Sequence, residues 1–147
     1  MSKTIVRFAA QKKSYPVADG IVATGWMPGQ CMTLESDGLS VKLANTDNTM
    51  FVAIDDDLEL SSPPTGSLVT VAFGAGTEII VDHSQEVANA DSSRVYASEV
   101  ESASAGANLY VGPTGKWQTT TTGSVKAKLS EIPNSNSNYK LGLILRF

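Results

Sequence analysis

The sequence is poor in the residue types that catalysis and metal binding most often use. It holds one cysteine, Cys31, and one histidine, His83, among 147 residues. A single cysteine excludes an intrachain disulfide and a zinc site built from several cysteines. The sequence also lacks an apolar run long enough to span a membrane or to form the core of a secretory leader. We therefore expect synthesis in a cytoplasm and no membrane insertion.

Charge is also scarce, and the composition favours strands over helices. Charged residues make up 18% of the chain and hydrophobic residues 41%, which is too apolar for a disordered chain. The length suits one domain with one core. Glycine, serine, threonine and asparagine are common while lysine and arginine are few, and this balance indicates strands and turns. We expect an all-β fold.

The charge that is present divides the chain into three parts. Residues 1–18 carry four bases and no acid, which gives +4. Residues 19–101 carry fourteen acids and two bases, which gives −12, and residues 102–147 carry five bases and one acid, which gives +4. The three parts sum to the net charge of −4. This asymmetry fits a protein whose two ends face one partner, and it also fits a solvated acidic surface on an ordinary domain.

Short apolar-rich runs between glycine, proline, asparagine and aspartate breaks predict antiparallel strands. The expected strands cover 21–24, 30–34, 39–43, 50–54, 67–73, 77–81, 107–111, 116–121, 125–132 and 140–147. Within 67–73 and 140–147, apolar residues alternate with a period of two, as in a half-buried strand. Residues 84–105 predict a short helix or a surface loop. The sequence therefore predicts a small β-barrel or β-sandwich over 19–147, preceded by an extended N-terminal arm over 1–18.

One internal similarity supports this interpretation. Residues 29–38 align with residues 106–115 at a constant shift of 77, and each segment has glycine at both ends around a five-residue strand. Glycine accepts the positive φ that a tight hairpin turn needs. Two hairpins of similar design are expected, although any β protein repeats such a unit.

The chain offers few candidates for chemistry. His83 lies between Asp82 and Ser84, but neighbours on an extended strand point to opposite faces, so both cannot reach the imidazole ring. The acidic run Asp55–Glu59 lacks the glycine and the spaced oxygen ligands of a calcium-binding loop. We expect no enzymatic activity, no catalytic residue, no cofactor and no metal site.

The aromatic residues leave a binding alternative open. Trp26 and Trp117 are candidates for stacking on a sugar ring, whereas a net charge of −4 argues against binding to nucleic acid. Sugar binding by a glycan- or receptor-binding β module, of the kind that a phage tail or adhesin carries, is the alternative function. Tryptophans on short strands more often pack in a core or an interface.

Residues 106–121, Gly-Ala-Asn-Leu-Tyr-Val-Gly-Pro-Thr-Gly-Lys-Trp-Gln-Thr-Thr-Thr, resemble a pattern found in small phage head-decoration proteins. In that pattern a glycine-led strand with Leu-Tyr precedes a turn and a threonine-rich strand. Residues 123–125 and 141–145 also fit it, so the similarity is specific over about 106–147. The resemblance implies a β-barrel or sandwich that binds the outside of an assembled capsid and reinforces it, often as a trimer. The implied partner is the major capsid protein, and the implied location is the virion surface, after synthesis in the host cytoplasm.

The basic arm and the apolar C-terminus are the candidate contact regions. An arm with strand propensity and unpaired backbone groups can add to the edge of a neighbouring sheet. An apolar chain end is usually tied into a sheet or an interface. The predicted interface residues are Ile5, Arg7, Phe8, Lys12, Lys13, Leu145 and Phe147.

Overall fold

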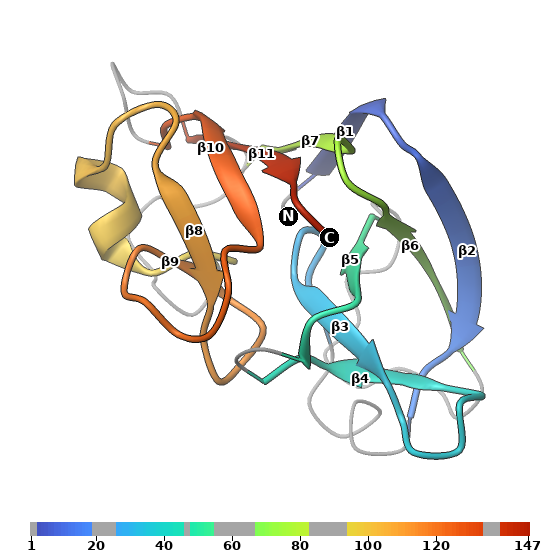
Figure 1. Cartoon of the computed structure of the whole chain (residues 1–147). Coiled ribbons are helices and arrows are strands. Elements are labelled where there is room, and N and C mark those ends of the chain that lie inside the picture. The colour runs from blue at the N-terminus through green and yellow to red at the C-terminus, as the bar shows by residue number, and fades with distance from the viewer. Residues whose placement is uncertain (1–2, 19–25, 46–47, 55–66, 83–93, 134–138) are drawn as a thin grey trace.

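The computed structural model describes residues 3–18, 26–45, 48–54, 67–82, 94–133 and 139–147, and it contains two antiparallel sheets (Figure 1). The six-stranded sheet has the order β1 (Lys3–Phe8), β7 (Glu78–Asp82), β11 (Lys140–Leu145), β10 (Ala127–Glu131), β8 (Asn108–Val111) and β9 (Trp117–Gln118). The five-stranded sheet has the order β2 (Gln11–Pro16), β6 (Leu68–Phe73), β5 (Phe51–Ala53), β3 (Cys31–Leu34) and β4 (Val41–Leu43). The predicted all-β class is confirmed, and within the described residues neither sheet closes into a barrel.

The expected strands appear with small changes at their ends. The largest difference between an expected and an observed strand is at 116–121, where only Trp117–Gln118 forms a strand, β9. Part of the ambiguous segment 84–105 is a short 3-10 helix, η3 (Ser98–Ser102), while 84–93 lies outside the described residues. The strand expected at 21–24 also lies outside them.

Residues 3–16 are extended, as expected, but they pair with strands of the same chain instead of forming a separate arm. Strand β1 pairs with β7, where Val6 lies opposite Ile79, and strand β2 pairs with β6. The side chain of Thr4 is buried, and its hydroxyl donates a hydrogen bond of 2.7 Å to the carbonyl of Ile54. Tyr15 on β2 packs against the apolar residues of the five-stranded sheet, so the segment is part of the fold at both of its strands.

The two N-terminal strands and strands β6 and β7 form one long antiparallel ribbon that bends from one sheet into the other. The bend lies at Ala10 on one strand of the ribbon and at Gly74–Thr77 on the other. Gly74 has φ of +102°, and a Cβ there would lie 2.6 Å from the Cβ of Ala10, so only glycine fits this turn. At the bend, the chain leaves the five-stranded sheet and enters the six-stranded one.

A buried threonine holds the bend together. Thr77 is 0% exposed, and its hydroxyl accepts a hydrogen bond of 3.1 Å from the backbone N–H of Ala10. The same hydroxyl donates one of 3.0 Å to the carbonyl of Phe73. The backbone of Thr77 also accepts a hydrogen bond from the N–H of Leu145, while the N–H of Gly76 donates to the carbonyl of Leu145. Three chain segments therefore meet at this residue.

Two apolar cores lie on opposite faces of the five-stranded sheet. Alternate residues of its strands, such as Cys31, Val52 and Ala72, join residues of the six-stranded sheet in the first core. Their neighbours Met32, Phe51, Ala53 and Val71 belong to the second core. The period of two predicted within 67–73 is confirmed, because Val69, Val71 and Phe73 all belong to or pack against this second core. The first core lies between the two sheets, and it also buries Leu141, Leu143 and Leu145.

The two hairpins expected from the shift of 77 are present. Strand β3 pairs with β4, and strand β8 pairs with β9. Both pairs of glycines, Gly29 with Gly38 and Gly106 with Gly115, have positive φ. A Cβ at Gly115 would lie 2.6 Å from the carbonyl oxygen of Cys31, so this turn packs directly against β3.

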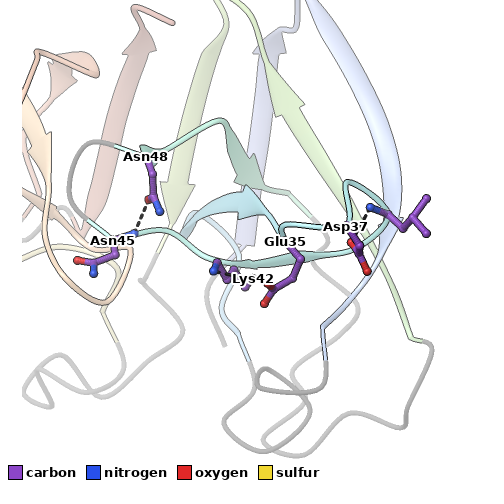
Figure 2. Close-up of polar contacts among 6 residues, drawn as sticks. Glu35, Asp37, Lys42, Asn45 and Asn48 are labelled. Carbon is purple, nitrogen blue, oxygen red and sulfur yellow. Dashed lines mark hydrogen bonds and ion pairs between the residues drawn. The ribbon is translucent and has the colours of Figure 1, made fainter.

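The turn of the β3–β4 hairpin is fixed by local polar contacts (Figure 2). The Asp37 carboxylate accepts a hydrogen bond of 2.8 Å from the N–H of Leu39, and Lys42 lies 3.6 Å from the carboxylate of Glu35. Farther along, the side chain of Asn48 accepts a hydrogen bond of 2.7 Å from the N–H of Asn45. These contacts are exposed, so we expect them to set the turn conformation and to add little stability.

Replacement of Thr77 by valine is expected to lower the free energy of unfolding by about 1–3 kcal/mol, because it leaves the Ala10 N–H and the Phe73 carbonyl without this partner. Valine keeps the shape of the side chain, so cavity formation adds little. Urea unfolding monitored by tryptophan fluorescence measures the change. Thr77→Ser retains the hydroxyl and should lose less stability than Thr77→Val. Equal stability of Thr77→Val and the wild type would contradict the importance of this residue at the bend.

Candidate interaction surface

The N-terminal segment supplies an edge strand to both sheets. Strand β1 is the first strand in the order of the six-stranded sheet, and β2 is the first in that of the five-stranded sheet (Figure 1). An edge strand uses its hydrogen-bonding groups on one side only and leaves a row of backbone N–H and C=O groups on the other. Within the described residues, β1 and β2 are therefore the edge strands of the two sheets, with the bend between them.

The phase of the β2–β6 ladder shows which backbone groups point outward. The N–H of Val17 donates a hydrogen bond of 2.9 Å to the carbonyl of Ser67, so this pair is of the hydrogen-bonded kind. In an antiparallel ladder such pairs alternate with non-hydrogen-bonded ones. Counting back along the register of this ladder, Lys12, Ser14 and Pro16 are the positions whose backbone groups face away from β6. Pro16 thus occupies a position where its missing N–H costs no ladder bond.

Four of the predicted interface residues lie exposed on this edge. Arg7, Lys12 and Lys13 are exposed, and Phe8 is 59% exposed. Arg7 lies in a β-bulge and its guanidinium is 3.5 Å from the carboxylate of Glu78. The ammonium of Lys13 lies 4.8 Å from the centroid of the Tyr15 ring. The structure therefore places three cations and one large apolar side chain on the N-terminal edge strands of the two sheets.

The C-terminal part of the predicted interface differs from the expectation. Leu145 is 0% exposed and belongs to the first core, so it is not available to a partner. Leu145 lies on the same face of β11 as Leu141 and Leu143, and this face points into the core between the sheets. Phe147 is partly buried against the same core, and the ammonium of Lys126 lies 6.0 Å from its ring centroid. Ile5 pairs with Ile80 through the backbone, and its side chain lies outside the described part of the structure.

Of the residues considered for chemistry and for sugar binding, Asp82 is half-buried at the end of β7, and the others are buried or lie outside the described residues. Cys31 is buried, and desolvation raises the pKa of its thiol well above the usual value, which keeps it protonated. Trp26 and Trp117 are buried, and the indole N–H of Trp117 donates to the carbonyl of Gly29 at 3.1 Å. Stacking of a sugar on either indole is therefore excluded. His83 and Asp55–Glu59 lie outside the described residues.

Two further findings concern only the described residues. They contain no group of three or more histidine, cysteine, aspartate or glutamate side chains placed to hold a metal ion. They also contain no helix long and apolar enough to cross a membrane.

A polar cluster around η3 was not predicted. The carboxylate of Glu99 accepts hydrogen bonds from the backbone N–H groups of Thr119 at 2.8 Å and Thr120 at 2.9 Å, and from the Thr120 hydroxyl. These bonds, chiefly that from the Thr120 backbone, lower the pKa of Glu99 from its usual value of 4.5. The partners are backbone amides about twenty residues away, and no sequence pattern marks such partners.

A second cluster lies beside it. The guanidinium of Arg94 is 2.6 Å from the carboxylate of Glu101, which also accepts a hydrogen bond of 3.2 Å from the Tyr96 hydroxyl. Burial raises the pKa of Tyr96 to about 12, so its hydroxyl remains a donor near neutral pH. Both clusters connect η3 to neighbouring segments, and each is satisfied within the chain.

A scan against protein-family models and a search of curated proteins each found no match to this chain. The surface and its geometry are therefore the basis for the functional argument.

Replacement of Glu99 by glutamine tests the η3 contact through its pH dependence. A lowered folded-state pKa stabilises the fold above pH 4.5, and this contribution is lost as the pH falls through the folded-state value. Glu99→Gln should be less stable than the wild type at pH 7, by less than about 1.5 kcal/mol because the carboxylate is largely solvated. The difference should shrink below pH 4.

Thermal unfolding measured by circular dichroism between pH 3 and pH 7 gives both values. Glu35→Gln is the matched control, because it removes the same charge from a carboxylate whose contact with Lys42 is 3.6 Å and exposed. A loss for Glu99→Gln that does not change with pH would contradict this role of the carboxylate.

Proposed function

We propose that this protein is a non-enzymatic structural subunit that binds the outer surface of an assembled phage-type capsid and stabilises it. The partner is the major capsid protein, and the working location is the virion surface after synthesis in the host cytoplasm. The observation that carries the proposal is the exposed N-terminal edge of both sheets, with Arg7, Phe8, Lys12 and Lys13 on it. The resemblance of residues 106–147 to head-decoration proteins supports it independently.

The edge supplies a mechanism for attachment. Open backbone groups on an edge strand can pair with a strand of another protein, and the surrounding side chains select the partner. Exposed cations increase the association rate with an acidic surface and make the binding sensitive to salt. Binding to the assembled shell and not to its free subunits stabilises the shell by mass action.

The pairing of residues 3–16 changes how attachment should be tested. Deletion of residues 1–16 removes β1 and β2. It therefore exposes the edge of β7 that pairs with β1 and the edge of β6 that pairs with β2. Such a truncated chain loses fold and surface together. Charge reversal at exposed positions such as Lys12 and Lys13 leaves the ladder intact and separates the two effects.

The proposed oligomer is a homotrimer, and it rests on the resemblance to decoration proteins. Leu145 no longer supports it, since this residue is buried within the chain. Sedimentation equilibrium at micromolar concentration should give a mass of three chains of 15.5 kDa. A mass of one chain over the whole concentration range would contradict self-association in solution.

Decorated shells are expected to rupture at a higher temperature than undecorated shells. At a free concentration one hundred times the Kd, binding contributes about 2.7 kcal/mol for each occupied site. Light scattering during heating, at confirmed full occupancy, measures the rupture temperature. Lys12→Glu combined with Lys13→Glu should weaken shell binding and reduce its salt dependence.

The control reverses two lysines that lie away from the edge, Lys42 on β4 and Lys128 on β10. This control variant has the same net charge as the Lys12→Glu and Lys13→Glu variant, so a non-specific effect of charge would weaken both. Equal rupture temperatures for shells with and without the protein would overturn the proposed function.

A further inference from the structure

We infer that the outer edge of β2 is a docking site for an extended acidic segment of a partner protein, which pairs with β2 as a sixth strand of the five-stranded sheet. The inference names the chemistry of the partner surface. It rests on the proposed function for the identity of that partner, whereas the geometry of the site stands on the contacts below.

The backbone of β2 defines the length of the site. Lys12 and Ser14 each present an outward N–H and C=O, whereas the C=O of Pro16 faces β4 at the parallel bridge of Val17 with Val41. At about 3.3 Å per residue, the span from Lys12 to Tyr15 is about 10 Å and matches a partner strand of about four residues.

The site is closed at both ends. Before it, the N–H of Ala10 is already bonded to the hydroxyl of Thr77. After it, Val17 forms an isolated parallel bridge with Val41, and the N–H of Ala18 donates to the carbonyl of Val41 at 2.8 Å. The open edge therefore ends before Pro16. An added strand has a defined start and end, which sets its register.

The neighbouring strand β1 is a poorer site for such pairing. Its register with β7 shifts between Val6 and Phe8, which places Arg7 in a bulge. A bulge bends an edge strand and interrupts regular pairing. Strand β2 keeps one register with β6 over all six residues.

The charge of β2 is not balanced across its own ladder. Lys12 lies opposite Ala72 and Lys13 lies opposite Val71, and strand β6 carries no charged residue. Opposite charges in directly facing positions stabilise paired strands, so acidic residues on an incoming strand add to the backbone bonds. Adjacent residues of a strand point to opposite faces, so Lys12 and Lys13 place one cation on each face. The fitting segment carries two neighbouring acids.

The side chains around the lysines favour an ordered edge. Ser14 and Thr70 lie across the ladder with their hydroxyl oxygens 3.2 Å apart, on the face of Lys12. On the other face, Lys13 lies over the Tyr15 ring, which packs against Phe51 with ring centroids 5.1 Å apart. Both neighbours are anchored in the sheet, so the cations sit on a preorganised strand, which lowers the entropic cost of binding.

A second copy of this chain is a poor occupant. Pairing of β2 with β2 of another copy brings four lysines into one short ladder, and β2 has no acidic residue to offset them. Like charges that face each other destabilise paired strands. The edge thus disfavours pairing with itself and favours an acidic strand.

The test uses two blocked seven-residue peptides of valine and threonine that differ at two adjacent central positions, which are glutamates in one and lysines in the other. Fluorescence anisotropy of the labelled peptides is measured against the full chain at low salt. The glutamate peptide should bind and the lysine peptide should not. Hydrogen exchange should slow at the Lys12 and Ser14 amides, whose N–H groups face outward.

Ser14→Pro and Ser14→Ala form the matched pair of variants. Proline at this position removes an outward N–H and no bond to β6, whereas both variants remove the hydroxyl contact with Thr70. Ser14→Pro should weaken peptide binding at least about five-fold relative to Ser14→Ala, as expected for the loss of a backbone hydrogen bond. Circular dichroism confirms that both variants are folded.

Charge reversal provides a second readout that does not depend on proline. The chain with Lys12→Glu and Lys13→Glu should bind the lysine peptide in preference to the glutamate peptide. If the wild type binds neither peptide, or if neither Ser14→Pro nor the charge reversal changes binding, the inference is wrong and the lysines serve only to prevent self-pairing.

Capsid shells separate this inference from the proposed function. Peptide binding by a protein that does not bind shells would retain the docking site and overturn the capsid function. Shell binding that Ser14→Pro leaves unchanged would retain the capsid function and overturn the docking site.

Discussion

The whole arrangement depends on the bend at Thr77. One buried hydroxyl bonds both strands of the ribbon, through the Ala10 N–H and the Phe73 carbonyl, at the point where they pass from one sheet to the other. The backbone of the same turn is bonded to Leu145 near the end of β11. Because the bend lies between the sheets, it fixes how they face each other and encloses the first core. Polar groups inside that core have no water to replace these bonds, which makes them costly to lose.

The bend also explains why the N-terminal segment is an edge in both sheets. Strands β7 and β6 pass from one sheet to the other at the bend, and the N-terminal segment runs antiparallel beside them. As a result, β1 pairs with β7 in one sheet and β2 pairs with β6 in the other. Strand β6 in turn carries apolar residues on both faces, with Val71 in the second core and Ala72 in the first. A strand buried on both faces needs both of its neighbours, β2 and β5, to satisfy its backbone. The segment that the sequence analysis interpreted as an arm therefore supplies two strands of the fold, β1 and β2.

Sequence patterns predicted the elements of this fold better than their partners. A period of two identified the inward faces of β6 and β11, and four glycines at a fixed shift identified two hairpins with the required positive φ. These features are local. The pairing of β1 with β7 joins residues seventy or more positions apart, and no periodicity in residues 3–8 distinguishes a strand paired inside the chain from one paired outside. For the same reason Leu145 was assigned to an interface, since an apolar terminus looks alike in both settings. The Glu99 contact was missed because its partners are backbone amides.

The basic edge combines two requirements that oppose each other. An exposed strand edge pairs readily with other chains, and lysine and proline at Lys12, Lys13 and Pro16 reduce that tendency. The same cations attract an acidic strand, and their effect is strongest for a partner whose charges face them directly. Salt weakens this attraction because the Debye length at physiological ionic strength is about 8 Å. Backbone pairing is short-ranged and less sensitive to salt, so the charges govern which strand approaches and the hydrogen bonds govern how long it stays. An edge of this kind remains unpaired among copies of itself and is still open to one class of partner.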